Sequence, residues 1–194
     1  MNRFFIRALA GSAILVASGY AGLAPSSAAG PAGFDPLDAD PAAIAVAVGK
    51  PDHLRLKTGD VTMRLAFESD DKSLEFDEKF ELEIVDSDAG GSPGGSLAPG
   101  EQVQIARLAA VDRARLADTQ AKARAARGKG RGALDIALRG GCRTGELDQE
   151  HLRVSTYMRT QARGEFFVLA RDIPLTHAFG MGSKARIPAC KSAP

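Results

Sequence analysis

Several short segments of this chain alternate apolar and polar residues with a period of two, and this pattern constrains the fold more than any other feature. In residues 61–67 the apolar side chains are Val61, Met63, Leu65 and Phe67, and polar or small residues lie between them. Successive side chains of a β-strand point to opposite faces. The segment is therefore predicted to be a strand with one buried face.

The same alternation predicts further strands at residues 43–48, 75–85, 102–108, 133–139, 152–158 and 166–170, with a short extended piece at 54–57. A polar loop separates the last two strands, so they are expected to form a hairpin. In residues 75–85, Glu78 interrupts the apolar positions Phe76 and Phe80. That interruption is compatible with a β-bulge near Asp77 and Glu78.

One segment, residues 109–127, has the alanine, arginine and leucine content that favours a helix. Gly128 is expected to end this helix, and the glycine-rich run after it is expected to be a loop. Residues from Asp172 onward are expected to be irregular. Strands before and after a single helix predict a β-rich α+β fold, an antiparallel β-sandwich-like domain of six to seven strands with one inserted surface helix.

The N-terminal residues have the order of a secretory signal peptide: a basic start with Arg3 and Arg7, an apolar run at 8–16, and a tract of small residues at 24–30. We expect cleavage near Ala28 or Ala29, which makes residues 1–29 the signal peptide. Residues 30–42 are then an extended leader, and residues 43–194 a single β-rich domain. The apolar run is too short for a membrane span of about 20 residues. The predicted location is the periplasm or the exterior of the cell.

The two cysteines, Cys142 and Cys190, are predicted to form a disulfide, because an exported protein folds in an oxidising compartment. The bond would join the C-terminal tail to the end of the strand that finishes near Gly141. In the chain-entropy model, a loop of this length stabilises the fold by about 4 kcal/mol.

Charge is unevenly distributed along the chain. Residues 68–88 carry ten acidic side chains against two lysines, and residues 107–143 carry ten basic side chains against three aspartates. A possible patch for an anionic lipid or a polysaccharide phosphate consists of Lys122, Arg124, Arg127, Lys129 and Arg131. The alternatives are a solvated face or pairing with the acidic segment. After residue 29 the net charge is −1, which gives no overall attraction to nucleic acid.

Catalytic and metal-binding motifs are weak. His177 and Asp172 could combine with a hydroxyl of Ser155, Thr156 or Ser183, but spacing alone does not establish a triad. We therefore assign no catalytic residue.

The run from Asp86 to Gly90 begins like a calcium loop but lacks the later ligands that an EF-hand needs. The three histidines show no zinc-ligand spacing. No metal site and no cofactor is predicted.

Residues 41–48, 54–57 and 167–172, together with Arg159, resemble exported envelope proteins of Gram-negative bacteria that have no assigned activity. Several such proteins begin with a lipoprotein-type signal, from which Tyr20 departs because lipidation needs a cysteine. The resemblance implies an envelope location and transfers no catalytic residue.

We expect a non-catalytic binding or structural module whose partner is an envelope protein or another envelope component. Nucleic acid is not an expected partner, and membrane contact is peripheral at most. An exposed apolar edge or patch would favour a protein partner. The alternative is a periplasmic hydrolase, and the oligomeric state is left open.

Overall fold

The computed structural model describes residues 37–85, 93, 97, 101–125, 130–148, 151–162, 164–179 and 187–191. Its strands are β1 (Ala45–Pro51), β2 (Leu54–Arg55), β3 (Val61–Ser69), β4 (Glu75–Val85), β5 (Glu101–Leu108), β6 (Gly130–Leu138), β7 (Cys142–Arg143), β8 (Arg153–Arg159) and β9 (Phe167–Pro174). Its helices are the 3-10 turn η2 (Ala110–Asp112), α1 (Arg113–Ala125) and the short α2 (Leu175–Ala178).

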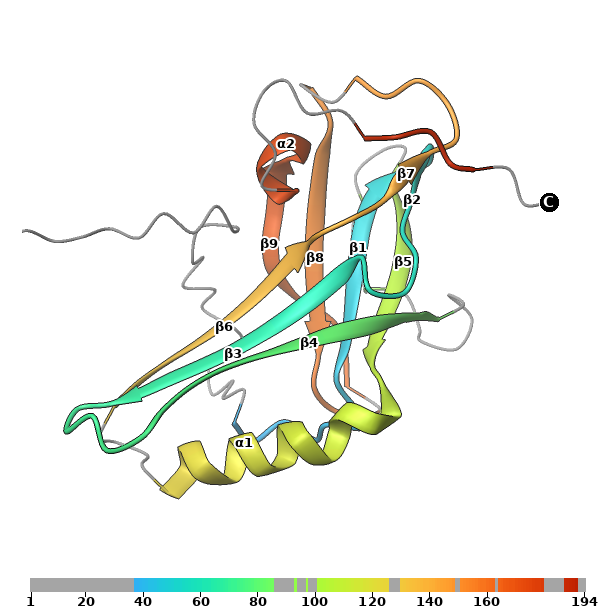
Figure 1. The fold of residues 1–194 in the computed structure, drawn as a ribbon. Coiled ribbons are helices and arrows are strands. Elements are labelled where there is room, and N and C mark those ends of the chain that lie inside the picture. The colour runs from blue at the N-terminus through green and yellow to red at the C-terminus, as the bar shows by residue number, and fades with distance from the viewer. Residues whose placement is uncertain are drawn as a thin grey trace, which may run out of the picture.

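Seven strands form one antiparallel sheet in the order β6-β3-β4-β5-β1-β8-β9, and β2 and β7 form a separate pair. The sheet is curled: β6, β3 and β4 run at an angle to the other four strands, and α1 lies across one end (Figure 1). This arrangement confirms the predicted β-rich α+β class. The sandwich-like character comes from the curl, which brings Leu134 of β6 and Met158 of β8 to the same buried gap.

The core occupies both faces of the central strands. Val46 and Val48 of β1 pack with Phe80 and Leu82 of β4 in the larger cluster. The intervening positions of β1 belong to a second, smaller cluster on the opposite face, which contains Ala45, Ala47, Ile105, Tyr157 and Phe166. A strand buried on both faces needs small or apolar residues at every position. The alanines of β1 meet that need on the second face.

The bulge that the sequence allowed near Asp77 and Glu78 is absent, because β3 and β4 pair without a break from Thr62–Glu81 to Glu68–Glu75. Glu78 keeps its inward position because its carboxylate binds Arg115 of α1, with 2.7 Å between Oε2 and Nη1.

Two expectations about irregular segments are wrong. The run after Gly128 is not all loop, since β6 begins at Gly130 beside Ser69. A Cβ at Gly130 would lie 2.5 Å from the carbonyl oxygen of Glu68, so this close approach requires glycine. The tail after Asp172 is also ordered at first, because it continues β9 to Pro174 and then forms α2.

The described part of the predicted leader is not extended. Residues 41–43 form a turn in which the amides of Ala43 and Ile44 donate to the carbonyl of Asp40. Ala39 is buried, and its carbonyl accepts a hydrogen bond from Gln120 of α1. The packed domain therefore includes residues before 43.

The predicted disulfide is present between Cys142 and Cys190, whose Cα atoms are 4.8 Å apart. Next to it, the Arg143 amide donates to the carbonyl of Pro188 and the Cys190 amide donates to the carbonyl of Arg143. The tail is thereby joined to β7. Within the described residues, no helix is long and apolar enough to cross a membrane.

Candidate functional site

The residues considered for catalysis do not form a triad in the part of the chain that the structure describes. Asp172 and Ser155 are neighbours, but it is the Asp172 amide that donates to Ser155 Oγ, at 3.5 Å. His177 is exposed on α2 and has no hydrogen bond or ion pair with Asp172 among these residues. Thr156 is buried on the opposite face of β8 from Ser155, and Ser183 lies outside the described residues.

The predicted basic patch is only partly described. Lys122 and Arg124 are exposed on α1, and Arg124 Nη1 donates to the carbonyl of Leu37 at 2.5 Å. Arg131 is exposed on β6, in register with Glu68 of β3. Arg127 and Lys129 lie outside the described residues. The described cations of the predicted patch therefore lie on two separate elements, α1 and β6.

The acidic and basic segments are joined by the ion pair between Glu78 and Arg115, and they are also neighbours in the sheet, where Glu68 is in register with Arg131 and Glu83 with Arg107. The acidic residues of the calcium-like run, Asp86 and Asp88, lie outside the described residues. Among the residues that are described, no group of three or more histidine, cysteine, aspartate or glutamate side chains could hold a metal ion.

A different group of side chains gathers on the face of the sheet that carries the smaller cluster. We call it the arginine face, and it consists of Arg107, Arg159, Arg171, Tyr157 and Phe166. Pairing of β1 with both neighbours places Arg107 of β5 and Arg159 of β8 on either side of Ala45. Residues directly opposite each other in a sheet share a face. The two guanidinium groups therefore project over the same small side chain.

Arg159 is held in place by an aromatic ring. Its Cζ atom lies 5.0 Å from the ring centre of Phe166, which is itself buried. The Nε atoms of Arg159 and Arg107 are both shielded from solvent. Burial lowers the pKa of Arg159, and repulsion from Arg107 lowers it further. The Arg159 guanidinium is therefore partly desolvated and lies close enough to Arg107 for the two positive charges to repel each other.

Tyr157 is two residues before Arg159 in β8, so both side chains lie on the same face of the sheet. Tyr157 is opposite Ala47. Its side chain is 2% exposed, and its hydroxyl has no hydrogen-bond partner among the described residues. The Arg171 guanidinium lies over its ring, 5.9 Å from the ring centre. A buried hydroxyl without a partner costs about 1–3 kcal/mol. Such a group is unusual in a folded protein and calls for an explanation.

Two carboxylates share this face. Glu83 of β4 is exposed and in register with Arg107. Glu101 lies over Gly49, because a Cβ at Gly49 would come within 2.5 Å of the Glu101 Cδ. Glu83 lies directly beside Arg107, whereas Glu101 is in register with Pro51 at the other end of β1. Arg107 and Arg159, which flank Ala45, can hold an anion between them.

The arginine face was not predicted, since each of its residues is ordinary when taken alone. The available signal was the small side chains at alternate positions of β1, namely Ala45, Ala47 and Gly49. They indicate that something packs closely on the second face of a central strand. They do not identify the flanking strands that supply the arginines.

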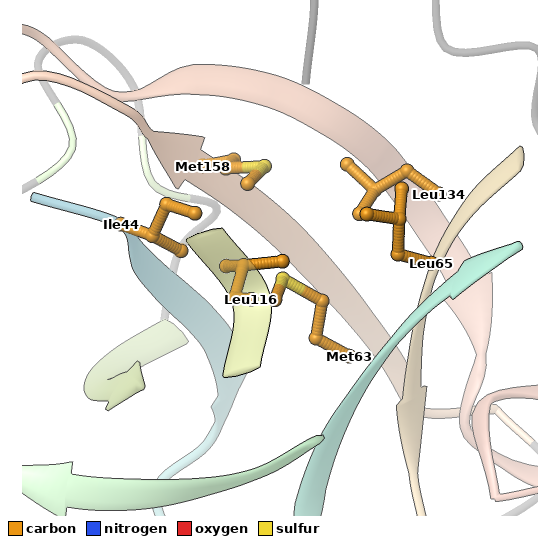
Figure 2. A pocket seen from close by; sticks show the side chains of 6 residues that line it. All are labelled: Ile44, Met63, Leu65, Leu116, Leu134 and Met158. Carbon is orange, nitrogen blue, oxygen red and sulfur yellow. The ribbon is translucent and has the colours of Figure 1, made fainter. Parts of the chain in front are cut away.

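Two other features were considered as sites. Figure 2 shows an apolar gap between α1 and the curled sheet, with a free volume of about 10 Å³. Its lining is Ile44, Met63, Leu65, Leu116, Leu134 and Met158. The space is about enough for one water molecule, and apolar walls give such a molecule no partner. The gap is a packing defect rather than a ligand site.

The second feature is Lys50, whose side chain is fully buried in the other face of β1. Its Nζ donates to the carbonyl of Leu54 at 2.6 Å. Burial is the main cause that lowers the pKa of Lys50 to about 8, and repulsion from Arg55 contributes. Because the amine is inaccessible, it connects β1 to β2 and does not form an open site.

Comparisons with protein-family models, with curated proteins and with solved structures found no match to this chain.

Proposed function

We propose that this chain is an exported, non-catalytic binding protein of the cell envelope, and that the arginine face is its binding surface. It acts in the periplasm or outside the cell, after removal of residues 1–29. The ligand is a polar envelope component.

One observation carries this proposal: Arg107 and Arg159 flank Ala45 on a half-buried face where the Tyr157 hydroxyl has no hydrogen-bond partner. A partly desolvated cation such as Arg159 and a buried phenol without a partner among the described residues lower the stability of a fold. Groups whose surroundings are unfavourable in this way cluster at functional sites. A bound anionic group would compensate both costs.

Export is supported by two independent features. The N-terminal residues have the pattern of a signal peptide. The Cys142–Cys190 bond belongs to the class of structural disulfides that persist in oxidising compartments.

A polar ligand is favoured over an apolar protein partner. The exposed large apolar side chains among the described residues are Val111, next to α1, and Val168, on β9. They do not form the apolar patch that docking of a protein usually uses. The hydrolase alternative draws no support from the described residues, because no hydrogen bond or ion pair among them joins His177 to Asp172 or Ser155.

The test is native mass spectrometry of the protein isolated from its own envelope fraction without denaturation. The polypeptide should have lost the signal peptide and be two hydrogens lighter than the dithiol form. It should also retain additional mass that disappears in Arg159→Gln. Arg153→Gln is the matched control, because it removes the same charge from the same face of β8, about 20 Å away.

Two results would contradict the proposal. A full-length mass with free thiols would refute export. Absence of retained mass, or retained mass that survives Arg159→Gln, would refute the assignment of the arginine face as the binding surface.

A further inference from the structure

We infer that the arginine face binds a phosphoryl group held between Arg107 and Arg159, with the Tyr157 hydroxyl as an additional hydrogen-bond donor. This inference rests on the proposed function and specifies the chemical class of the ligand.

The spacing of the two arginines suits one anion. They lie on strands that flank β1 on its two sides, so their Cα atoms are about 10 Å apart. Both side chains rise from the same face, and Ala45 is the residue between them in the sheet. Long flexible side chains at this separation can place both guanidinium groups around a single anion. Both arginines also interact with other parts of the protein, so the anion would join an existing set of contacts.

The aromatic rings restrict where the cations can go. Phe166 supports the Arg159 guanidinium from one side, which reduces the side-chain entropy lost on binding. Tyr157 supports Arg171 in the same way. The site is thus partly organised before a ligand arrives.

A phosphoryl group satisfies these donors better than a carboxylate. Each guanidinium presents several N–H groups in a planar fork that matches phosphate and carboxylate oxygens. A carboxylate has two oxygens in one plane, and one fork can occupy both. The tetrahedral oxygens of a phosphoryl group can accept hydrogen bonds from Arg107, from Arg159 and from a third donor at the same time. The buried Tyr157 hydroxyl, which has no partner among the described residues, is that third donor.

Glu83 offers a test that does not depend on damaging the site. Its exposed carboxylate lies beside Arg107 in the sheet and opposes an anion electrostatically. Replacing it by glutamine removes one negative charge and retains the shape of the side chain. Binding of a phosphoryl group should therefore become stronger in Glu83→Gln.

The experiment is titration of the full, disulfide-bonded chain with inorganic phosphate. Binding is monitored by isothermal titration calorimetry and by the NMR signals of the backbone amides of β1 and β8. We expect saturable binding at one site. Arg107→Gln and Arg159→Gln should each weaken it at least tenfold, and Tyr157→Phe about threefold or more. Glu83→Gln should strengthen it about twofold to threefold. Arg153→Gln should change it less than twofold. Thermal unfolding establishes that each variant is folded.

Vesicles distinguish the source of the phosphoryl group. Binding to phosphatidylglycerol vesicles, lost in Arg159→Gln and absent for phosphatidylcholine vesicles, together with phosphate binding, would identify a lipid headgroup. Phosphate binding without vesicle binding would identify a ligand that is not embedded in a membrane. Both outcomes support the inference.

The inference is overturned if phosphate does not saturate a site, or if Arg153→Gln weakens binding as much as Arg159→Gln. It is also overturned if Glu83→Gln leaves phosphate binding unchanged. These failures are separable from failure of the proposed function. Mass retained by the native protein and lost in Arg159→Gln, without phosphate binding, would show that the arginine face binds a ligand of another class.

Discussion

The guanidinium group of Arg115 in α1 lies over the ring of Phe80 in β4, with its Cζ atom 4.1 Å from the ring centre. The same group is ion-paired with Glu78 and Asp112, at 2.7 and 2.8 Å, and donates to the carbonyl of Lys79. Hydrogen bonds to the carboxylates of Asp112 and Glu78 raise the pKa of Arg115 above its usual value. The helix is therefore attached to the sheet by a cation that covers an apolar ring, in place of a broad apolar surface.

Replacing Arg115 by glutamine should lower the free energy of unfolding by about 1–2 kcal/mol. A cation–π contact near the surface contributes about 0.5–1 kcal/mol, and an exposed ion pair contributes about 0.2–1 kcal/mol. Urea unfolding measures the change. Arg113→Gln is the control, because Arg113 is exposed on the same helix, and its effect should stay within about 0.5 kcal/mol. Equal effects of the two variants would show that the Phe80 contact contributes nothing.

Leu116 is the one large apolar side chain among the four residues that α1 buries, the others being Thr119, Gln120 and Ala123. It borders the gap shown in Figure 2. Leu116→Ala should therefore enlarge an existing void and destabilise the protein by about 2–5 kcal/mol. The amides of α1 should also exchange hydrogen faster than those of β1.

Val111 provides the matched control for that variant, since it is 86% exposed at the start of the same helical segment. Val111→Ala also removes apolar carbon, but should change the stability by less than about 0.5 kcal/mol. If Leu116→Ala were equally mild, the polar contacts of α1 alone would hold the helix in place.

How far sequence reasoning succeeds depends on whether a feature is local. Strand positions follow from alternation within one segment, and the predicted bounds of residues 75–85 coincide with β4. The helix also follows from local composition. In the structure α1 begins later than the predicted start at residue 109, because residues 110–112 form η2. Gly130 shows the limit of local reasoning. In the sequence this glycine indicates a loop, whereas in the structure it lies in β6 and allows the close approach of the Glu68 backbone.

Pairing between distant strands is not encoded by any local pattern. The strands β5, β1 and β8 are neighbours in the sheet, although β1 lies far from both in the sequence. The arginine face exists only because that pairing places Arg107 and Arg159 beside Ala45. The disulfide could be predicted because two cysteines allow a single pairing.

Removal of the Cys142–Cys190 bond should lower the free energy of unfolding by about 4 kcal/mol, from the loop-closure entropy that the unfolded chain regains. The double variant Cys142→Ser, Cys190→Ser, measured by urea unfolding against the oxidised protein, tests this. Protection of backbone amides from hydrogen exchange should fall most near the position of the bond. The amides of residues 143 and 190 should therefore lose their protection first. An unchanged unfolding midpoint would mean that the hydrogen bonds between β7 and the tail suffice.

Lys50 makes the stability of the fold depend on pH in the alkaline range. Its pKa is lowered from 10.5 to about 8 in the folded protein, chiefly by burial. The unfolded chain, where the lysine has its ordinary pKa, therefore binds more protons between these two values. Stability should rise as the pH increases through this window, and the contribution is about 3 kcal/mol in total.

Lys50→Met should abolish this rise, because methionine fills a similar volume and does not titrate. Urea unfolding at pH 7, 8, 9 and 10 measures the slope of the free energy of unfolding against pH. Lys57→Met removes an exposed lysine and should leave the slope unchanged, which accounts for the other groups that titrate in this range. If the wild-type slope persisted in Lys50→Met, the buried amine would not be its origin. If the slope were lost only in Lys50→Met, the single bond to the Leu54 carbonyl would be too weak to offset burial of the charge.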